Sequence, residues 1–413
     1  MGYFKDALKG ISWMTAFRVA HRLLGIVRIS IIAHILSPYN LGVFGIATIS
    51  LGFLEIITET GINIFLVQEK GGVEKYIDSA WVVSIFRGFL ISAVILATAD
   101  AVSSFFKSPE SRILLYLVAV VPLIRGFINP AIVKFQKDLN FNKEFFYRVS
   151  MYLAETIFSI AGALILRNPL GLIFGLWGGA LYEVVYTFIV VRPLPRFVID
   201  FEKVKKVIKR GVWVTAFGIF DYIYTQSDNI IVGRILGVTS LGIYQNAYKI
   251  STIPLSEVGD IFFRVTFPIF SKISEEADRL KRAFFKTLAI NGSLMIAAGV
   301  LVYLFASPIV KILFGQGWEA AIPAVKLLSI LGVTRGIAAS TNSLLVAKKK
   351  QKYSAIVTLV SALGLLTTIV PLTKTYGIIG AGLSAIIGTL ISLPLTIYFV
   401  RKTLNEKSKD KPI

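Results

Sequence analysis

The feature that most constrains this chain is a series of apolar runs, each long enough to cross a lipid bilayer. A membrane-spanning helix needs about 20 mostly apolar residues, and about twelve such runs follow one another along the 413 residues. Hydrophobic residues make up 55% of the chain and charged residues only 16%, a balance unsuited to a water-soluble surface. The ten-residue alternation of a transmembrane barrel is absent. The expected spans are centred near Arg22, Leu54, Leu90, Val121, Ser159, Ala180, Tyr222, Leu255, Ala297, Leu331, Leu363 and Leu390. The sequence therefore predicts an all-α membrane protein.

Basic residues are distributed unevenly between the loops. The chain has 44 lysines and arginines against 24 acidic residues, a net charge of +20. When loops are assigned alternately to two sides, about 30 of the basic residues fall on the side of the N-terminus, about 5 on the other and about 9 inside spans. Runs such as "EKVKKVIKR" (Glu202 to Arg210) and "KKKQK" (Lys348 to Lys352) belong to the richer side. We therefore expect a cytoplasmic (cell) membrane protein with both termini cytoplasmic, whose basic runs face anionic lipids rather than nucleic acid.

The residues that would carry catalysis or hold a metal are scarce. There is no cysteine, and His21 and His34 are the only histidines, so zinc has too few ligands. No Gly-rich phosphate loop ends in Lys-Ser or Lys-Thr, which argues against an ATP-driven pump. We expect no metal, no cofactor and no enzymatic activity.

An internal repeat organises the chain. A shift of 200 residues aligns "WMTAF" (Trp13 to Phe17) with "WVTAF" (Trp213 to Phe217), and ten of the 35 positions from 13 to 47 are identical to their counterparts. An even offset in span number predicts two parallel six-helix bundles, residues 1–198 and 199–413. Parallel repeats commonly hold substrate at their shared interface and work by alternating access.

The first expected span carries a cationic stripe. At 100° per residue, Arg18, His21, Arg22, Gly25 and Arg28 fall within an arc of about 120°. Each arginine facing lipid at the bilayer centre would oppose insertion by roughly 2.5 to 3.5 kcal/mol. The stripe must therefore face protein or water.

The corresponding face of the seventh span is acidic. Asp221 and Asp228 lie on one face, and the repeat aligns His21 with Asp221 and Arg28 with Asp228. We expect an aqueous cavity lined by these opposed stripes.

Two interpretations of the stripe remain open. In the structural one, Arg28 pairs with Asp228, and Arg18 or Arg22 pairs with a glutamate of the second span. The candidate glutamates are Glu55 and Glu59. In the functional one, which we favour for Arg18 and Arg22 over Arg28, guanidinium groups bind the phosphate of a substrate.

Five stretches at helix boundaries carry a family resemblance. They are "ILSPYNLGVFGIATI" (Ile35 to Ile49), "ETGINIFLVQEK" (Glu59 to Lys70), "KFQKDLNF" (Lys134 to Phe141), "SDNIIVGRILGVTSLGIYQNAYKISTIPL" (Ser227 to Leu255) and "LFGQGWEAA" (Leu313 to Ala321). These stretches resemble the polysaccharide transporter family, which includes the O-antigen flippases, within the multidrug/oligosaccharidyl-lipid/polysaccharide exporter superfamily. The resemblance covers nearly the whole chain.

The resemblance implies a V-shaped transporter with a central cavity, which moves a lipid-linked oligosaccharide on polyprenyl phosphate or diphosphate to the outer leaflet. By position, it also implies that Arg18, Arg22 and Arg28 hold the phosphates.

Other intramembrane charges are harder to assign. Lys249 on the eighth span fits either the cavity or a helix-pairing contact. Three arginines lie in spans expected to be peripheral, where pairing with Glu155 or Glu183, or snorkelling, is the favoured interpretation. These are Arg87, Arg125 and Arg335. Pro254 predicts a kink in the eighth span.

Three function classes follow, of which a flippase for a lipid-linked sugar fits best. A proton- or Na⁺-coupled drug or cation antiporter is the alternative, and a polysaccharide polymerase is disfavoured by the short outer loops. Four carboxylates are candidates for carrying a coupling proton or Na⁺. They are Glu55, Glu59, Asp221 and Asp228. The expected partners are the lipid-linked substrate and membrane lipids, and the expected state is a monomer.

Overall fold

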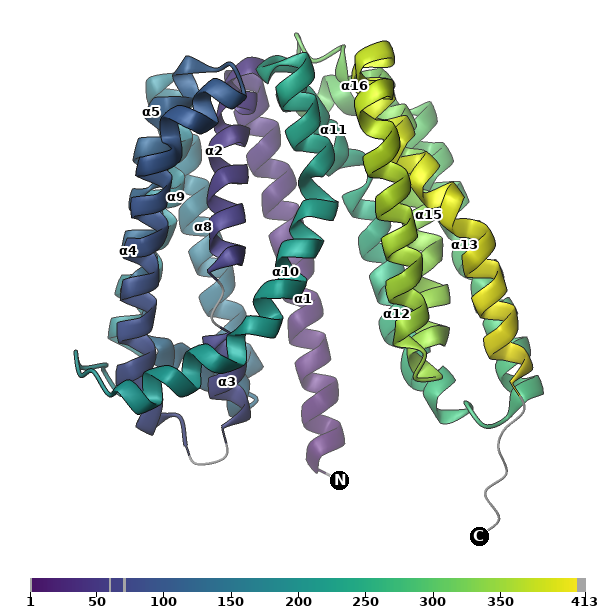
Figure 1. Ribbon diagram of the computed structural model, residues 1–413, viewed down its shortest axis with the longest axis horizontal. Coiled ribbons are helices and arrows are strands. Elements are labelled where there is room, and N and C mark those ends of the chain that lie inside the picture. Colours follow the sequence, from purple (N-terminus) through teal and green to yellow (C-terminus); the bar gives the residue numbers. More distant parts are fainter. Residues whose placement is uncertain (1, 59–60, 70–71, 407–413) are drawn as a thin grey trace. The chain divides into compact units, whose positions relative to one another are not determined.

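The computed structural model of the chain describes residues 2–58, 61–69 and 72–406 (Figure 1). Every regular element in these ranges is helical, and they contain no strand. The elements are α1 (Gly2–Ile35), α2 (Pro38–Ile57), α3 (Ile62–Gln68), α4 (Glu74–Phe105), α5 (Pro109–Val118), α6 (Val120–Gly126), the 3₁₀ helix η1 (Pro130–Val133), α7 (Lys134–Lys137), α8 (Phe141–Leu166), α9 (Leu170–Val190), α10 (Phe201–Leu236), α11 (Val238–Ser251), α12 (Ile253–Lys272), α13 (Ala277–Leu304), α14 (Ala306–Phe314), α15 (Ala321–Ala347) and α16 (Gln351–Asn405).

The expected spans coincide with these helices. Within the described ranges, seven helices are long and apolar enough to cross a membrane: α2, α4, α8, α9, α13, α15 and α16. A pair of segments bent by 69°, Pro109–Gly126 with Pro130–Lys137, is long and apolar enough when taken together. The centres expected at Arg22, Tyr222 and Leu255 lie in α1, α10 and α12. All the expected span centres therefore lie in helices.

The longest helix, α16, is a hairpin of two expected spans. Gly377 interrupts it with φ 61° and ψ −139°. A methyl group added to Gly364 would lie 2.9 Å from the Cα of Gly388, and one added to Gly380 would lie 1.9 Å from the carbonyl oxygen of Leu372. Because positions before Gly377 meet positions after it in reverse order, the two halves are antiparallel, as the two expected spans require.

The turn after the first helix of each repeat lies at the same place. Ser37 caps α2, its hydroxyl accepting a hydrogen bond from the Asn40 amide at 3.4 Å, and Pro38 starts the helix. Two hundred residues later, Gly237 lies at the N-cap of α11 with a φ of 85°, which glycine adopts at no steric cost. In the eighth span, α11 ends at Ser251 and α12 begins at Ile253, just before Pro254. The two helices thus meet two residues before Pro254, and the kink expected there stays a prediction.

The chain forms two compact units, Met1–Gln226 and Ser227–Ile413. Each unit buries its own apolar residues. In the first, Phe65, Ile77 and Val133 belong to one buried cluster, and in the second Phe270 and Phe284 belong to another. The predicted bundles of residues 1–198 and 199–413 stay a prediction about which spans act together.

A seam of small residues joins α8 and α9. A methyl group on Gly171 would lie 2.3 Å from the carbonyl oxygen of Gly162, and one on Gly175 would lie 1.7 Å from the Ser159 hydroxyl. Glycine allows the two backbones to approach this closely, a common device between membrane helices. The seam fixes the rotation of α8, and with it the direction in which Glu155 points.

We predict that Gly171→Ala destabilises the protein, because neither backbone at the seam can yield. An overpacked core costs typically 1 to 3 kcal/mol, roughly a shift of several degrees in the thermal midpoint. Gly292→Ala in α13 is the matched control, since a methyl group there meets nothing within 4 Å. Thermal unfolding in detergent, followed by tryptophan fluorescence, compares them. Equal midpoints for both variants and the wild type would contradict a close-packed seam.

Candidate functional site

The cationic stripe of α1 packs against α8 within the first unit. The ring of Trp13 lies 5.1 Å from that of Phe145, and the ring of His21 lies 4.1 Å from that of Tyr152. Gly25 leaves room for Tyr152, whose hydroxyl would lie 3.2 Å from an added methyl group. Contacts that lie further along α1 also lie further along α8, so the two helices are parallel neighbours. This face of α1 therefore meets a helix of its own unit.

Arg28, the last residue of this face, forms an ion pair with Glu155 of α8. Its Nη1 atom lies 2.6 Å from the Oε1 atom of Glu155, and each side chain is only 14% exposed. A pairing of Arg28 with Asp228 was one of the two interpretations that the sequence left open, and the structure shows Arg28 paired with Glu155 of α8. The repeat aligns two positions of the sequence, whereas the partner of Arg28 is the carboxylate that the rotation of α8 presents to it.

Arg18 and Arg22 lie on the same helix one to three turns earlier. Both are half-buried, and each takes part in polar interactions. The charge of Arg22 acts on Tyr152, which places it beside the α8 contact. The three arginines thus follow one another along α1.

Glu55 pairs with Arg125, which the sequence analysis placed in a peripheral span. Its Oε1 atom accepts from Arg125 of α6 at 3.0 Å, and its backbone carbonyl accepts from Arg87 of α4 at 2.5 Å. Arg87 also donates to the Thr58 hydroxyl at 3.2 Å. The contact between Glu55 and Arg125 was not among the pairings that the sequence left open. The charges of Glu155 and Glu183 also act on Arg125, as the sequence allowed. Glu59 lies outside the described residues.

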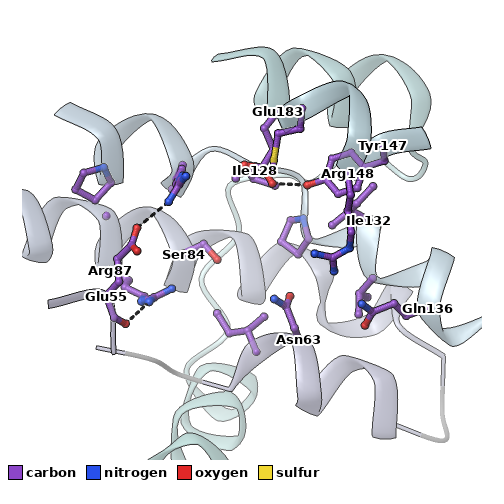
Figure 2. Close-up of a pocket in the computed structure, with 18 of the residues that line it drawn as sticks. Glu55, Asn63, Ser84, Arg87, Ile128, Ile132, Gln136, Tyr147, Arg148 and Glu183 are labelled. Atoms are coloured by element: carbon purple, nitrogen blue, oxygen red, sulfur yellow. Dashed lines mark hydrogen bonds and ion pairs between the residues drawn. The ribbon is translucent and has the colours of Figure 1, made fainter. Parts of the chain in front are cut away.

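Glu55, Arg87 and Arg125 line a cavity of about 570 Å³ inside the first unit. Figure 2 shows Arg87 and Glu55 at one side of it and Tyr147, Arg148 and Glu183 at the other. Glu144 also faces it, accepting hydrogen bonds from Gln136 at 2.6 Å and Arg148 at 2.8 Å. The cavity is therefore lined by both charged and apolar residues, and two of its guanidinium groups, those of Arg125 and Arg148, are held by carboxylates.

Sequence reasoning missed this cavity. It assigned Arg87 and Arg125 to peripheral spans, away from any functional site, whereas both line the cavity. The available signal was the set of charges inside α2, α4, α6, α8 and α9. Because intramembrane charges face an interior, charges on five spans of one bundle indicate a shared polar interior.

The second unit holds a separate buried carboxylate. Asp228 of α10 is 3% exposed and accepts from the Tyr244 hydroxyl at 2.9 Å and from the Asn229 amide at 2.8 Å. Arg335 of α15 donates to Tyr248, and its charge also acts on Asp228. Arg335 thus belongs to this network rather than to a peripheral lipid-facing position.

The other two expected site residues are exposed. Asp221 lies on α10, where its backbone carbonyl accepts from the Thr225 hydroxyl at 2.8 Å. Lys249 lies on α11 and has a polar interaction. Across the described ranges, no group of three or more histidines and carboxylates could hold a metal ion.

A family model described as "Polysaccharide biosynthesis protein" matches residues 31–323. The chain belongs to this family. Among its relatives, the lipopolysaccharide biosynthesis protein WzxC of Escherichia coli K12 is 23% identical over 85% of this chain and 72% of WzxC. The teichuronic acid biosynthesis protein TuaB of Bacillus subtilis 168 is 25% identical over 83% of this chain and 72% of TuaB.

The fold is similar to that of solved transporters. The lipid II flippase MurJ, in an inward closed conformation, matches with a TM-score of 0.75 and 17% identity over 95% of this chain and 90% of MurJ. An inward-facing multidrug resistance MATE family transporter matches with a TM-score of 0.69 and 13% identity over 95% and 96% of the two chains. The expected fold class, a multi-pass all-α membrane protein, is confirmed. The resemblance to the polysaccharide transporter family is confirmed as well.

We predict that Arg28 and Glu155 are energetically coupled. Removing one partner of a buried pair leaves an unpaired charge and typically costs 3 to 5 kcal/mol, whereas replacing both with apolar residues is often close to neutral. Arg28→Leu and Glu155→Leu should each destabilise the protein, and the double variant should recover most of the loss.

Unfolding in mixed micelles across a double-mutant cycle measures this coupling. The exposed pair Arg112 and Asp100, whose side chains are 53% and 64% exposed, is the control. Its removal should change the stability little, because water screens an exposed pair. Additive losses for Arg28 and Glu155 would mean that the pair is not a unit.

Proposed function

We propose that this chain is a flippase, which moves a lipid-linked oligosaccharide on polyprenyl phosphate or diphosphate across the cytoplasmic membrane for cell-surface polysaccharide biosynthesis. The observation that carries the proposal is the succession of arginines on α1 in a member of the polysaccharide biosynthesis protein family. The names of WzxC and TuaB, and the fold shared with MurJ, support it.

The arginines of α1 have the chemistry that a diphosphate needs. A guanidinium group donates two parallel hydrogen bonds to phosphate oxygens, and a succession of them along one helix suits two linked phosphates. We assign Arg18 and Arg22 to the phosphates, with Arg28 and Lys249 as further contacts. In this proposal, alternating access between the two bundles carries the headgroup through a central cavity.

Energy for transport comes, in this proposal, from a proton or Na⁺ gradient. Asp228 is the best supported coupling residue because it is buried and held by a neutral hydroxyl. Glu55, Glu59 and Asp221 are the further candidates. The protein transports rather than catalyses, works as a monomer and keeps both termini in the cytoplasm.

A second function is favoured by one observation. The likeness to a MATE family transporter, together with the buried carboxylate of Asp228, fits a proton- or Na⁺-coupled antiporter of organic cations. The arginines of α1 disfavour it, because they would repel a cationic substrate.

We predict that purified protein in nanodiscs binds polyprenyl diphosphate, and that the Arg18→Ala, Arg22→Ala double variant binds it at least about tenfold more weakly, a difference of about 1.4 kcal/mol. The physical reason is the loss of two charge-assisted phosphate contacts. Polyprenol, which lacks the phosphates, is the control ligand. Arg112→Ala, at an exposed arginine, is the control variant.

Unchanged binding in the double variant would remove Arg18 and Arg22 from the headgroup site. A wild type that ignores the lipid but binds organic cations would replace the flippase with the antiporter.

We also predict that Asp228→Asn slows transport in proteoliposomes while leaving lipid binding within about threefold, roughly 0.6 kcal/mol. The amide keeps the size of the side chain but cannot carry a proton or pair with Na⁺. Collapsing either gradient separately shows which ion the wild type uses. Normal gradient-driven transport by the variant would exclude Asp228 from coupling.

A further inference from the structure

The pair of Arg28 and Glu155 occupies a special position in the proposed flippase. Arg28 is on α1 with Arg18 and Arg22, but unlike a phosphate-binding group it is held by a carboxylate at 2.6 Å. Glu155 lies near the middle of α8 (Phe141–Leu166), which is long and apolar enough to span the membrane. An anionic phosphate and an ionised Glu155 would therefore compete for the same guanidinium group.

Charged and polar groups from several helices surround Glu155. From α1 it faces Arg28, and His21 and Arg22 lie about two turns earlier on that helix, beside Tyr152. On α8 itself, Tyr152 lies one turn away and interacts with both Arg28 and Glu155. From α9 it lies against Gly179, which carries no charge, and Glu183 lies further along that helix. From α6 the charge of Arg125 reaches it. The short helix α7 meets the far end of α8, where Gln136 donates to Glu144.

The neighbouring charges have partners of their own. Arg125 is held by Glu55 at 3.0 Å, and Glu183 accepts from Tyr147. The positive charge of Arg28 is thus balanced by Glu155 directly. If Arg28 turned to a phosphate, Glu155 would be left as an ionised carboxylate in an apolar span without its counter-charge. Such a group takes up a proton rather than stay ionised.

We propose that Glu155 is a proton-linked switch, which binds a proton when Arg28 leaves it for the phosphate of the substrate. The proposal rests on the proposed function and adds the linkage between substrate and proton at one named carboxylate. No bond is broken: one proton moves from solvent to a Glu155 oxygen, and the guanidinium exchanges one oxygen acceptor for another. The affinity for the anionic lipid then increases as the pH falls.

The test is binding of polyprenyl diphosphate to the full chain in nanodiscs from about pH 8 to about pH 5.5, for the wild type and Glu155→Gln. Uptake of one proton on binding gives up to about a tenfold gain in affinity for each pH unit lowered. The amide imitates the protonated carboxyl, so Glu155→Gln should bind at the low-pH affinity of the wild type throughout, apart from the titration of the lipid itself. Glu276→Gln, at an exposed glutamate paired with Arg279, should follow the wild type.

Calorimetry on the wild type keeps the test decisive if Glu155→Gln fails to fold. Titrations near pH 7.5 in two buffers of different ionisation enthalpy count the protons bound with the lipid, and an uptake approaching one proton supports the switch. The phosphates cannot supply this uptake, because contact with guanidinium groups lowers their own proton affinity.

Two results would overturn the switch while leaving the flippase in place: lipid binding without proton uptake, or the same pH profile in the wild type and Glu155→Gln. A wild type that does not bind the lipid at any pH would overturn the proposed function and the switch together.

Discussion

Every ionised side chain inside a membrane-spanning helix must be compensated by other protein groups or by water, and the interior of this protein is arranged around that constraint. In the first unit, guanidinium groups meet carboxylates directly, as in Arg28 with Glu155 and Arg125 with Glu55. In the second, the carboxylate of Asp228 is held by a tyrosine hydroxyl and a backbone amide. Within the described residues, these contacts explain how spans that carry charge can sit among apolar helices.

Helix packing decides which of these contacts form. The parallel register of α1 on α8 sets His21 beside Tyr152 and, two turns later, Arg28 beside Glu155. The glycine seam between α8 and α9 fixes the rotation that aims Glu155 at α1. A small shift of either helix would separate a buried charge from its partner. The seam and the ion pair therefore stabilise one another, although they are different interactions.

The sequence was sufficient to predict the helices, but not to predict which charged side chains pair between them. Apolar length predicts spans because lipid imposes it, and the aligned turns at Ser37 and Gly237 follow from the repeat. The partner of Arg28 stayed open between Asp228 and a substrate phosphate, since alignment says which positions correspond, not which side chains touch. The contact of Arg125 with Glu55 was not foreseen either, because it depends on helix rotation and depth, which no local pattern encodes. Glu155 became a candidate only through its distance to Arg28.

At the aligned positions 28 and 228, the two repeats compensate a buried charge in different ways, one basic and one acidic. Arg28 is balanced by a full charge, so any anion that takes Glu155's place must be accompanied by a proton or leave a charge behind. Asp228, at the aligned position, accepts hydrogen bonds from a tyrosine hydroxyl and a backbone amide, and the charge of Arg335 also acts on it. Under the proposed function, a chain built from two diverged repeats would in this way hold an anionic headgroup with one half and a coupling ion with the other.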